Sequence, residues 1–86
     1  MRLTIYSKPG CHLCDEMKSV IHRVVAQRAD ASAISLDEIY ISTDRDLLDH
    51  YGVEIPVLLI DGKKVAKYRV SETELTQMLE ARRGKG

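Results

Sequence analysis

The hydrophobic pattern of the chain changes its period between Ile5 and Leu13, and this change constrains the fold more than any other feature of the sequence. Leu3 and Ile5 predict a short strand that ends at residues 7–10. From Cys11 onward the apolar residues follow a helical spacing, which predicts a helix over about residues 12–28. Its buried face is expected to be formed by six side chains, those of Leu13, Met17, Val20, Ile21, Val24 and Val25.

The middle of the chain predicts a second strand and a short helix. The strand is expected from three apolar residues, Leu36, Ile39 and Ile41. Thr43 is expected to cap a helix over residues 44–51, and Gly52 is expected to end that helix in a left-handed conformation. We expect the helix to bury three side chains, those of Leu47, Leu48 and Tyr51.

The last third of the chain predicts a β hairpin followed by a helix. Residues 57–60 form an apolar run that is typical of a strand buried on both faces, and the Asp-Gly pair after it predicts a tight turn into a fourth strand that ends at Tyr68. Ser71 and Glu74 have the spacing of a capping box, which marks the start of the final helix. The core-facing side chains of that helix are expected to be Leu75, Met78 and Leu79.

The order of these elements is βαβαββα, which predicts an α/β fold with a mixed four-stranded sheet flanked by three helices. A length of 86 residues allows a single domain over residues 1–86, and a frayed basic tail is expected over residues 83–86. The 13 basic and 13 acidic side chains balance, so we expect neither nucleic acid nor an anionic membrane as the partner. With no apolar run of membrane-spanning length and no expected secretory signal, a cytoplasmic location is expected. We also expect a monomer.

Cys11 and Cys14 are the two cysteines of the chain, and they lie three positions apart. Random placement would give this spacing in only about 2% of arrangements, and two cysteines are too few for a secreted disulfide scaffold. Cys11 lies where the first strand passes into the helix, and Cys14 lies one turn inside it. We therefore expect Cys11 to be exposed and to attack a substrate disulfide, and Cys14 to resolve the mixed disulfide that forms.

The start of a helix stabilises a thiolate, so the pKa of the Cys11 thiol is expected to be moderately lowered. Lowering it from about 8.5 to about 6 would need about 3.4 kcal/mol of thiolate stabilisation, whereas a helix dipole supplies about 0.3–1 kcal/mol. Hydrogen bonds from first-turn N–H groups and the nearby cation of Lys8 are expected to add to this stabilisation. Asp15 and Glu16 oppose it because they are negatively charged.

Residues 6–14, Tyr-Ser-Lys-Pro-Gly-Cys-His-Leu-Cys, resemble the active-site entry of the glutaredoxins, and Ile55-Pro56 with the following strand and hairpin resembles their cis-proline loop. The element order is similar to the thioredoxin fold across essentially the whole chain. The resemblance implies that Cys11 is the nucleophile, Cys14 the resolving thiol and Lys8 a support for the thiolate. It implies that the Ile55–Pro56 bond is cis, although the residues alone favour trans. It also implies that substrate binds beside Ile55, Pro56 and Leu13.

Two departures from the glutaredoxin pattern concern glutathione and the residues around the cysteines. Glutaredoxins usually carry a Gly-Gly pair and then an acidic residue after the hairpin, where glutathione docks, but residues 66–71 here read Ala-Lys-Tyr-Arg-Val-Ser. The aromatic residue common before the second cysteine is replaced by Leu13. We therefore expect no bound cofactor, and we carry over the exchange chemistry without the glutathione site. Glutathione stays a candidate electron donor.

The expected function is thiol–disulfide oxidoreduction on a disulfide-bearing protein or small molecule, supported by a cellular thiol reductant. Two alternatives stay open at this point. The chain could be a non-catalytic binding or redox adaptor module on the same fold. It could also share a zinc ion or a metal cluster between two chains, since only Cys11, Cys14 and His12 are local ligands and zinc needs about four. For a single chain we expect no metal.

Overall fold

The computed structural model describes residues 1–83 of the chain. The predicted order of strands and helices is confirmed over these residues, with two short 3₁₀ helices, η1 and η2, in addition. The elements are β1 (Arg2–Ser7), α1 (His12–Ala26), η1 (Ala31–Ala33), β2 (Ser35–Tyr40), η2 (Ile41–Thr43), α2 (Arg45–Tyr51), β3 (Val57–Ile60), β4 (Lys63–Lys67) and α3 (Glu72–Arg83). Arg83 is thus the last residue of α3, and the rest of the expected tail over residues 83–86 lies outside the described residues.

The four strands form one mixed sheet in the order β2-β1-β3-β4. β1 pairs with β2 in parallel, so the first crossover through α1 forms the predicted βαβ unit. β1 and β3 pair antiparallel, and so do β3 and β4. The hairpin between β3 and β4 turns at Asp61 and Gly62, whose φ angles of 50° and 85° are those that a tight hairpin turn requires. This topology places β1, which leads to the cysteines, in the interior of the sheet.

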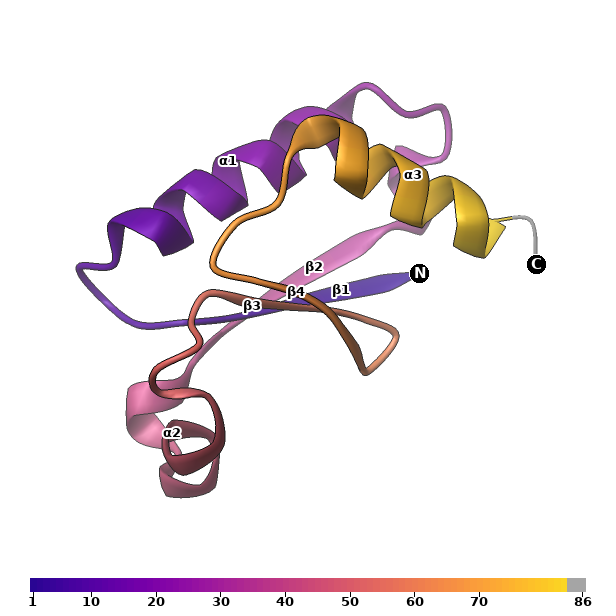
Figure 1. Cartoon of the computed structure of the whole chain (residues 1–86). Coiled ribbons are helices and arrows are strands. Elements are labelled where there is room, and N and C mark those ends of the chain that lie inside the picture. The colour runs from indigo at the N-terminus through magenta and orange to yellow at the C-terminus, as the bar shows by residue number, and fades with distance from the viewer. Residues whose placement is uncertain (84–86) are drawn as a thin grey trace.

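Helices lie on both sides of the sheet (Figure 1). α1 and α3 lie next to each other over one face, and α2 lies on the other side, near the end of β1 that leads into α1. The rings of Tyr6 in β1 and Tyr51 in α2 are 5.0 Å apart, which packs α2 against that end of the sheet. The main core lies between the sheet and the helix pair, and its buried side chains include Leu3, Ile5, Met17, Ile21, Leu58, Ile60, Leu75 and Leu79.

The start of α3 is fixed by the predicted capping box. The backbone N–H of Ser71 donates to Oε1 of Glu74 over 3.1 Å, and the N–H of Glu74 donates to Oγ of Ser71 over 3.0 Å. Two N–H groups that the helix leaves without a partner are therefore satisfied. Because this cap holds the first residues of α3, it also fixes where the segment after β4 approaches α1.

The predicted end of the first helix is wrong by two residues. The helix ends at Ala26 because the N–H groups of Gln27 and Arg28 donate to carbonyl oxygens only three residues back, which tightens the last turn. Arg28 is free to leave the helix and pairs with Asp30 and Glu80 at 2.8 and 3.0 Å.

Several predictions for the region around α2 are wrong. Asp44 caps this helix by accepting a hydrogen bond from the N–H of Leu47, whereas the hydroxyl of Thr43 donates to the carbonyl oxygen of Tyr40. The side chains expected to be buried are not, and 43% of Leu48 is exposed, because α2 packs at the end of the sheet and not across it. Gly52 has a right-handed conformation.

The second strand also ends earlier than its apolar residues suggested. Ile41 is buried, as expected for a core residue. It is the first residue of the 3₁₀ helix η2, however, and does not belong to β2. Ile39 lies in β2, where 38% of it is exposed. Burial of an apolar residue in this region therefore does not follow from strand periodicity.

Candidate active site

Cys11 is the N-cap residue of α1, which means that it directly precedes the first residue of the helix, His12. Its backbone is extended, with φ −92° and ψ 109°, and its Sγ accepts a hydrogen bond from the N–H of Cys14 over 3.2 Å. Its carbonyl oxygen accepts from the N–H of Asp15 over 3.1 Å. A first-turn N–H group and the positive end of the helix dipole therefore both point at this sulfur, which is the arrangement that stabilises a thiolate.

The two cysteines form a disulfide in the structure, with their Cα atoms 5.2 Å apart. Cys14 is 1% exposed, whereas Cys11 is half-buried at the start of the helix. The predicted enclosure of Cys14 is confirmed, whereas Cys11, which was expected to be exposed, is only partly so. Cys11 is therefore the more accessible residue of the pair.

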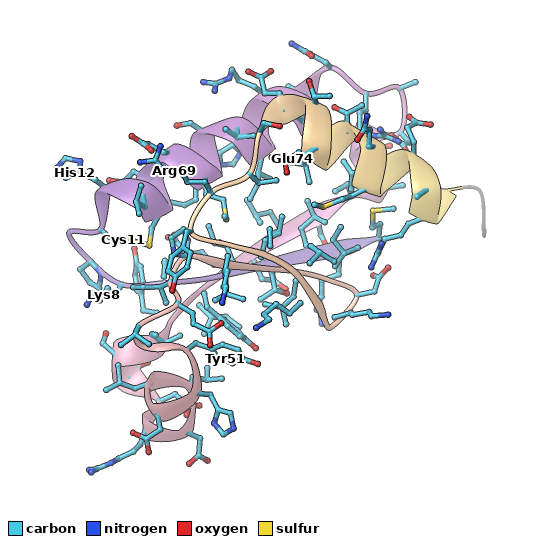
Figure 2. The ribbon with its side chains drawn as sticks, viewed as in Figure 1. Lys8, Cys11, His12, Tyr51, Arg69 and Glu74 are labelled. Atoms are coloured by element: carbon cyan, nitrogen blue, oxygen red, sulfur yellow. A yellow bond between two sulfur atoms is a disulfide. The ribbon has the colours of Figure 1, made fainter. Side chains whose placement is uncertain are left out.

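Lys8 and His12 flank Cys11 at the turn between β1 and α1 (Figure 2). Both side chains are exposed, and within residues 1–83 neither makes a hydrogen bond or an ion pair. Lys8 therefore lies with Cys11 in the connection between β1 and α1. Its support of the thiolate stays a prediction.

The loop that contains Ile55 and Pro56 leads into β3 at Val57, which pairs with Tyr6 near the end of β1. The Ile55–Pro56 peptide bond, which the resemblance implies to be cis, is cis in the structure. The carbonyl oxygen of Pro56 accepts a hydrogen bond from the N–H of Tyr68 over 2.8 Å, and the hydroxyl of Tyr68 donates to the carbonyl oxygen of Val53 over 3.2 Å. Tyr68 therefore joins the proline loop to the segment that follows β4.

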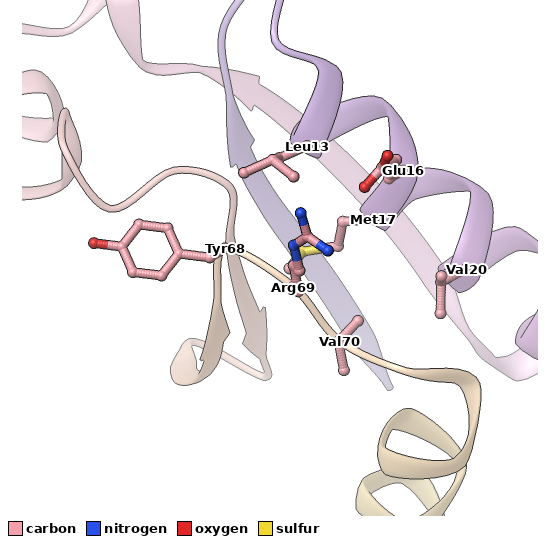
Figure 3. Close-up of a pocket in the computed structure, with 7 residues that line it drawn as sticks. All are labelled: Leu13, Glu16, Met17, Val20, Tyr68, Arg69 and Val70. Atoms are coloured by element: carbon pink, nitrogen blue, oxygen red, sulfur yellow. The ribbon is translucent and has the colours of Figure 1, made fainter.

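A pocket of about 180 Å³ lies between α1 and the segment after β4 (Figure 3). Leu13, one of the two residues between the cysteines, lines this pocket together with Tyr68 and Arg69. Tyr68 lines this pocket with Leu13 and is hydrogen-bonded to the proline loop, and substrate binding by Leu13, Ile55 and Pro56 stays a prediction. The sequence alone did not indicate Arg69, because its place opposite α1 depends on how α3 is packed.

A network of polar side chains lies behind the first turns of α1. Nζ of Lys18 contacts Oε2 of Glu38 in β2 at 2.8 Å, and the hydroxyl of the buried Ser7 donates to the same oxygen over 2.9 Å. The hydrogen bond from Lys18 lowers the pKa of Glu38, against the opposing effect of burial, and the bond from Ser7 lowers it further. This network ties α1 to the two parallel strands next to the cysteines, and no local sequence signal predicted it.

The described part of the chain offers little for a metal ion. Among residues 1–83 no group of three or more His, Cys, Asp or Glu side chains is placed to hold one.

Over the same residues, no helix has the length and the apolar character needed to cross a membrane.

Comparison with known proteins gives a consistent result. The family model of the Glutaredoxin-like domain (DUF836) matches residues 2–80. A glutaredoxin-like protein from Dictyostelium discoideum is 28% identical over 82 residues, which cover 93% of this chain and 76% of that protein.

Solved structures are similar over nearly the whole chain. The X-ray structure of a structural-genomics target protein from X. campestris is 26% identical with a TM-score of 0.73, and the match covers 92% of this chain and 96% of that one. Thioredoxin 1 from Thermosipho africanus is 16% identical with a TM-score of 0.65, covering 98% and 96% of the two chains. The last likeness is one of fold alone, and it agrees with the mixed α/β sheet described above.

Proposed function

The chain belongs to the Glutaredoxin-like domain family, and on this premise we propose that it is a thiol–disulfide oxidoreductase with Cys11 as the nucleophile. One observation carries the proposal. Cys11 and Cys14 are paired at the N-terminus of α1, and the sulfur of the half-buried Cys11 accepts a hydrogen bond from the N–H of Cys14. An adaptor module would not need a sulfur held in this position.

The proposed reaction has two exchange steps. The Cys11 thiolate attacks one sulfur of a substrate disulfide, so that a mixed disulfide forms and the other substrate sulfur leaves as a thiolate that takes up a proton. Cys14 then loses its proton, attacks Sγ of Cys11 and releases the second substrate sulfur as a thiol. The substrate gains two electrons and two protons, and the protein is left with the Cys11–Cys14 disulfide.

The helix start is proposed to activate Cys11 for the first step. A hydrogen bond to a thiolate is charge-assisted and stronger than one to a neutral thiol, so the N–H of Cys14 favours ionisation of Cys11. The helix dipole acts in the same direction, and the exposed cation of Lys8 lies in the same loop. These contributions together make Cys11 the better nucleophile of the pair at neutral pH.

The substrate is proposed to lie across Leu13 and the Ile55–Pro56 loop. The family resemblance implies that these residues contact the substrate and that the backbone before the proline pairs with the substrate chain. The proposed substrates are disulfides of proteins or small molecules, and a cellular thiol returns the protein to its dithiol form. Glutathione is one candidate for that thiol, and the cytoplasm, where thiols are kept reduced, is the proposed location.

The two matched variants Cys11→Ser and Cys14→Ser test the proposal. Cys11→Ser should abolish reduction of a small disulfide such as bis(2-hydroxyethyl) disulfide, because the attacking sulfur is lost. Cys14→Ser should retain the first step and accumulate a mixed disulfide, which intact-mass spectrometry detects as an adduct on Cys11. Unchanged turnover in the Cys11→Ser variant would overturn the proposal, because the activity would then not depend on the Cys11 sulfur.

A further inference from the structure

We propose that the pocket beside Leu13 binds an apolar side chain of a disulfide-bearing peptide, and that Arg69 binds an acidic residue of the same peptide. This inference rests on the proposed function, because it names the class of substrate that the site takes. The proposed ligand is a peptide segment of a protein substrate, in which an apolar and an acidic residue flank the reacting cysteine.

The floor of the pocket is apolar. Four of its lining side chains are aliphatic or thioether groups, those of Leu13, Met17 and Val20 in α1 and that of Val70 in the segment before α3. Met17 and Val70 are buried in the core, so the floor is a fixed surface. A volume of about 180 Å³ is large enough for an aliphatic side chain and too small for a drug-sized ligand.

Arg69 supplies a cation at the mouth of this pocket. Its guanidinium points across the pocket toward α1 (Figure 3). Arg2 and Arg23 each pair with a carboxylate at 3.1 and 3.2 Å, whereas within residues 1–83 the guanidinium of Arg69 has no partner. A guanidinium with its donors free is well suited to bind a carboxylate in two-point geometry.

Glu16 places a negative charge on the α1 side of the pocket. Its side chain lies on the α1 wall, on the other side of the opening from Arg69 (Figure 3), and the two make no ion pair. A bound carboxylate is repelled from the α1 side and attracted to the Arg69 side. The acidic residue of the peptide is therefore expected to point toward the segment after β4.

Tyr68 holds that segment in place. Its φ of 67° is unusual for a residue with a side chain, and its hydrogen bonds to Val53 and Pro56 tie it to the proline loop. Arg69 and the proline loop therefore keep a fixed spacing, so that a peptide paired with the loop would present its neighbouring side chains to the pocket. Glutathione would fill the pocket poorly, because the residues beside its cysteine carry no apolar side chain.

Four short peptides test the inference. Each carries one cysteine in a mixed disulfide with 2-mercaptoethanol, with Leu or Ser on one side of it and Glu or Gln on the other. The second-order rate constant for reduction by the prereduced full chain is measured for each peptide and for bis(2-hydroxyethyl) disulfide. The variants are Arg69→Gln, Glu16→Gln and, as a matched control on the exposed face of α2, Arg45→Gln.

Leu should be preferred over Ser by about tenfold and Glu over Gln by about fivefold. Arg69→Gln should remove the preference for Glu and keep the preference for Leu, Glu16→Gln should increase the preference for Glu, and Arg45→Gln should change neither. Each ratio is independent of changes in Cys11 reactivity, because those act on all peptides alike.

The outcomes separate this inference from the function on which it rests. If the small disulfide is reduced but the four peptides react at equal rates, the inference is wrong and the proposed function stands. A preference for Glu that persists in Arg69→Gln overturns the role of Arg69. If neither the small disulfide nor any peptide is reduced, the proposed function itself fails.

Discussion

The N–H of Cys14 donates a hydrogen bond to Sγ of Cys11 over 3.2 Å, so the second cysteine serves the first through its backbone as well as through its sulfur. Cys11 is the N-cap of α1, and Cys14 is the third residue of the helix. The sulfur therefore takes the place of the oxygen with which Ser, Thr or Asp usually caps a helix. Ionisation of Cys11 strengthens this cap, which couples the start of the helix to the reactivity of the thiol.

Glu38 should make the stability of the protein depend on pH in the acid range. Its pKa is lowered in the folded state, chiefly by the hydrogen bond from Lys18. The stabilisation is therefore complete above the ordinary Glu pKa of about 4.3 and is lost as the pH falls through the lowered value. Glu38→Gln should lower the free energy of unfolding by about 1 kcal/mol at pH 7, since the amide oxygen still accepts from Ser7 but no longer pairs with Lys18 as an ion.

Urea titrations of the wild type and Glu38→Gln at pH 7, 5, 4 and 3 measure this dependence. The difference between the two proteins should narrow as the pH falls from 5 to 3. Asp49→Asn, which changes an exposed carboxylate without an ion-pair partner in residues 1–83, is the control and should show no such narrowing. A difference that is constant over this range would contradict the assignment.

Asp44 should contribute more to the stability of α2 than its neighbour Thr43. Asp44→Ala removes the oxygen that accepts from the N–H of Leu47 and should cost about 1 kcal/mol. Thr43→Ala removes only an exposed hydrogen bond to the carbonyl oxygen of Tyr40 and should cost about 0.5 kcal/mol or less. Thermal unfolding followed by circular dichroism compares the two, and an equal or larger loss for Thr43→Ala would show that the cap is misassigned.

Two isoleucines on strands that are separated by β1 should respond differently to the loss of one methyl group. Ile60 in β3 is 1% exposed, and Ile60→Val should cost about 0.5–1.5 kcal/mol because it leaves a small cavity in the core. Ile39 in β2 is 38% exposed, and Ile39→Val should cost less than about 0.5 kcal/mol. Urea unfolding measures the free energy that each variant loses. Equal losses would mean that the face of the sheet on which Ile39 lies is covered in solution.

The elements that the sequence predicted well are those defined by short-range signals. The capping box of Ser71 and Glu74, the Asp61-Gly62 turn and the start of α1 at Cys11 each depend on residues within four positions of one another. The region of α2 was predicted poorly, because burial of Leu48 depends on which part of the sheet the helix meets. That position is a tertiary property and leaves no periodic signal in seven residues.

The same distinction holds for the candidate active site. The cysteine pair and its asymmetry follow from a strand that passes into a helix, so they were predicted from the sequence. The pairing of Lys18 with Glu38, and the approach of Arg69 to α1, each join segments that are distant in the chain. No residue pattern indicated either contact before the packing of the sheet and α3 was known.

The pH dependence of alkylation of Cys11 in the reduced protein tests the central claim most directly. Iodoacetamide labelling is followed by mass spectrometry, which assigns the label to Cys11 or to the enclosed Cys14. The proposed thiolate at the start of α1 predicts that the rate for Cys11 reaches a plateau above an apparent pKa well below 8. A rate that still rises through pH 8.5 would show an ordinary thiol and would contradict the proposed activation of Cys11.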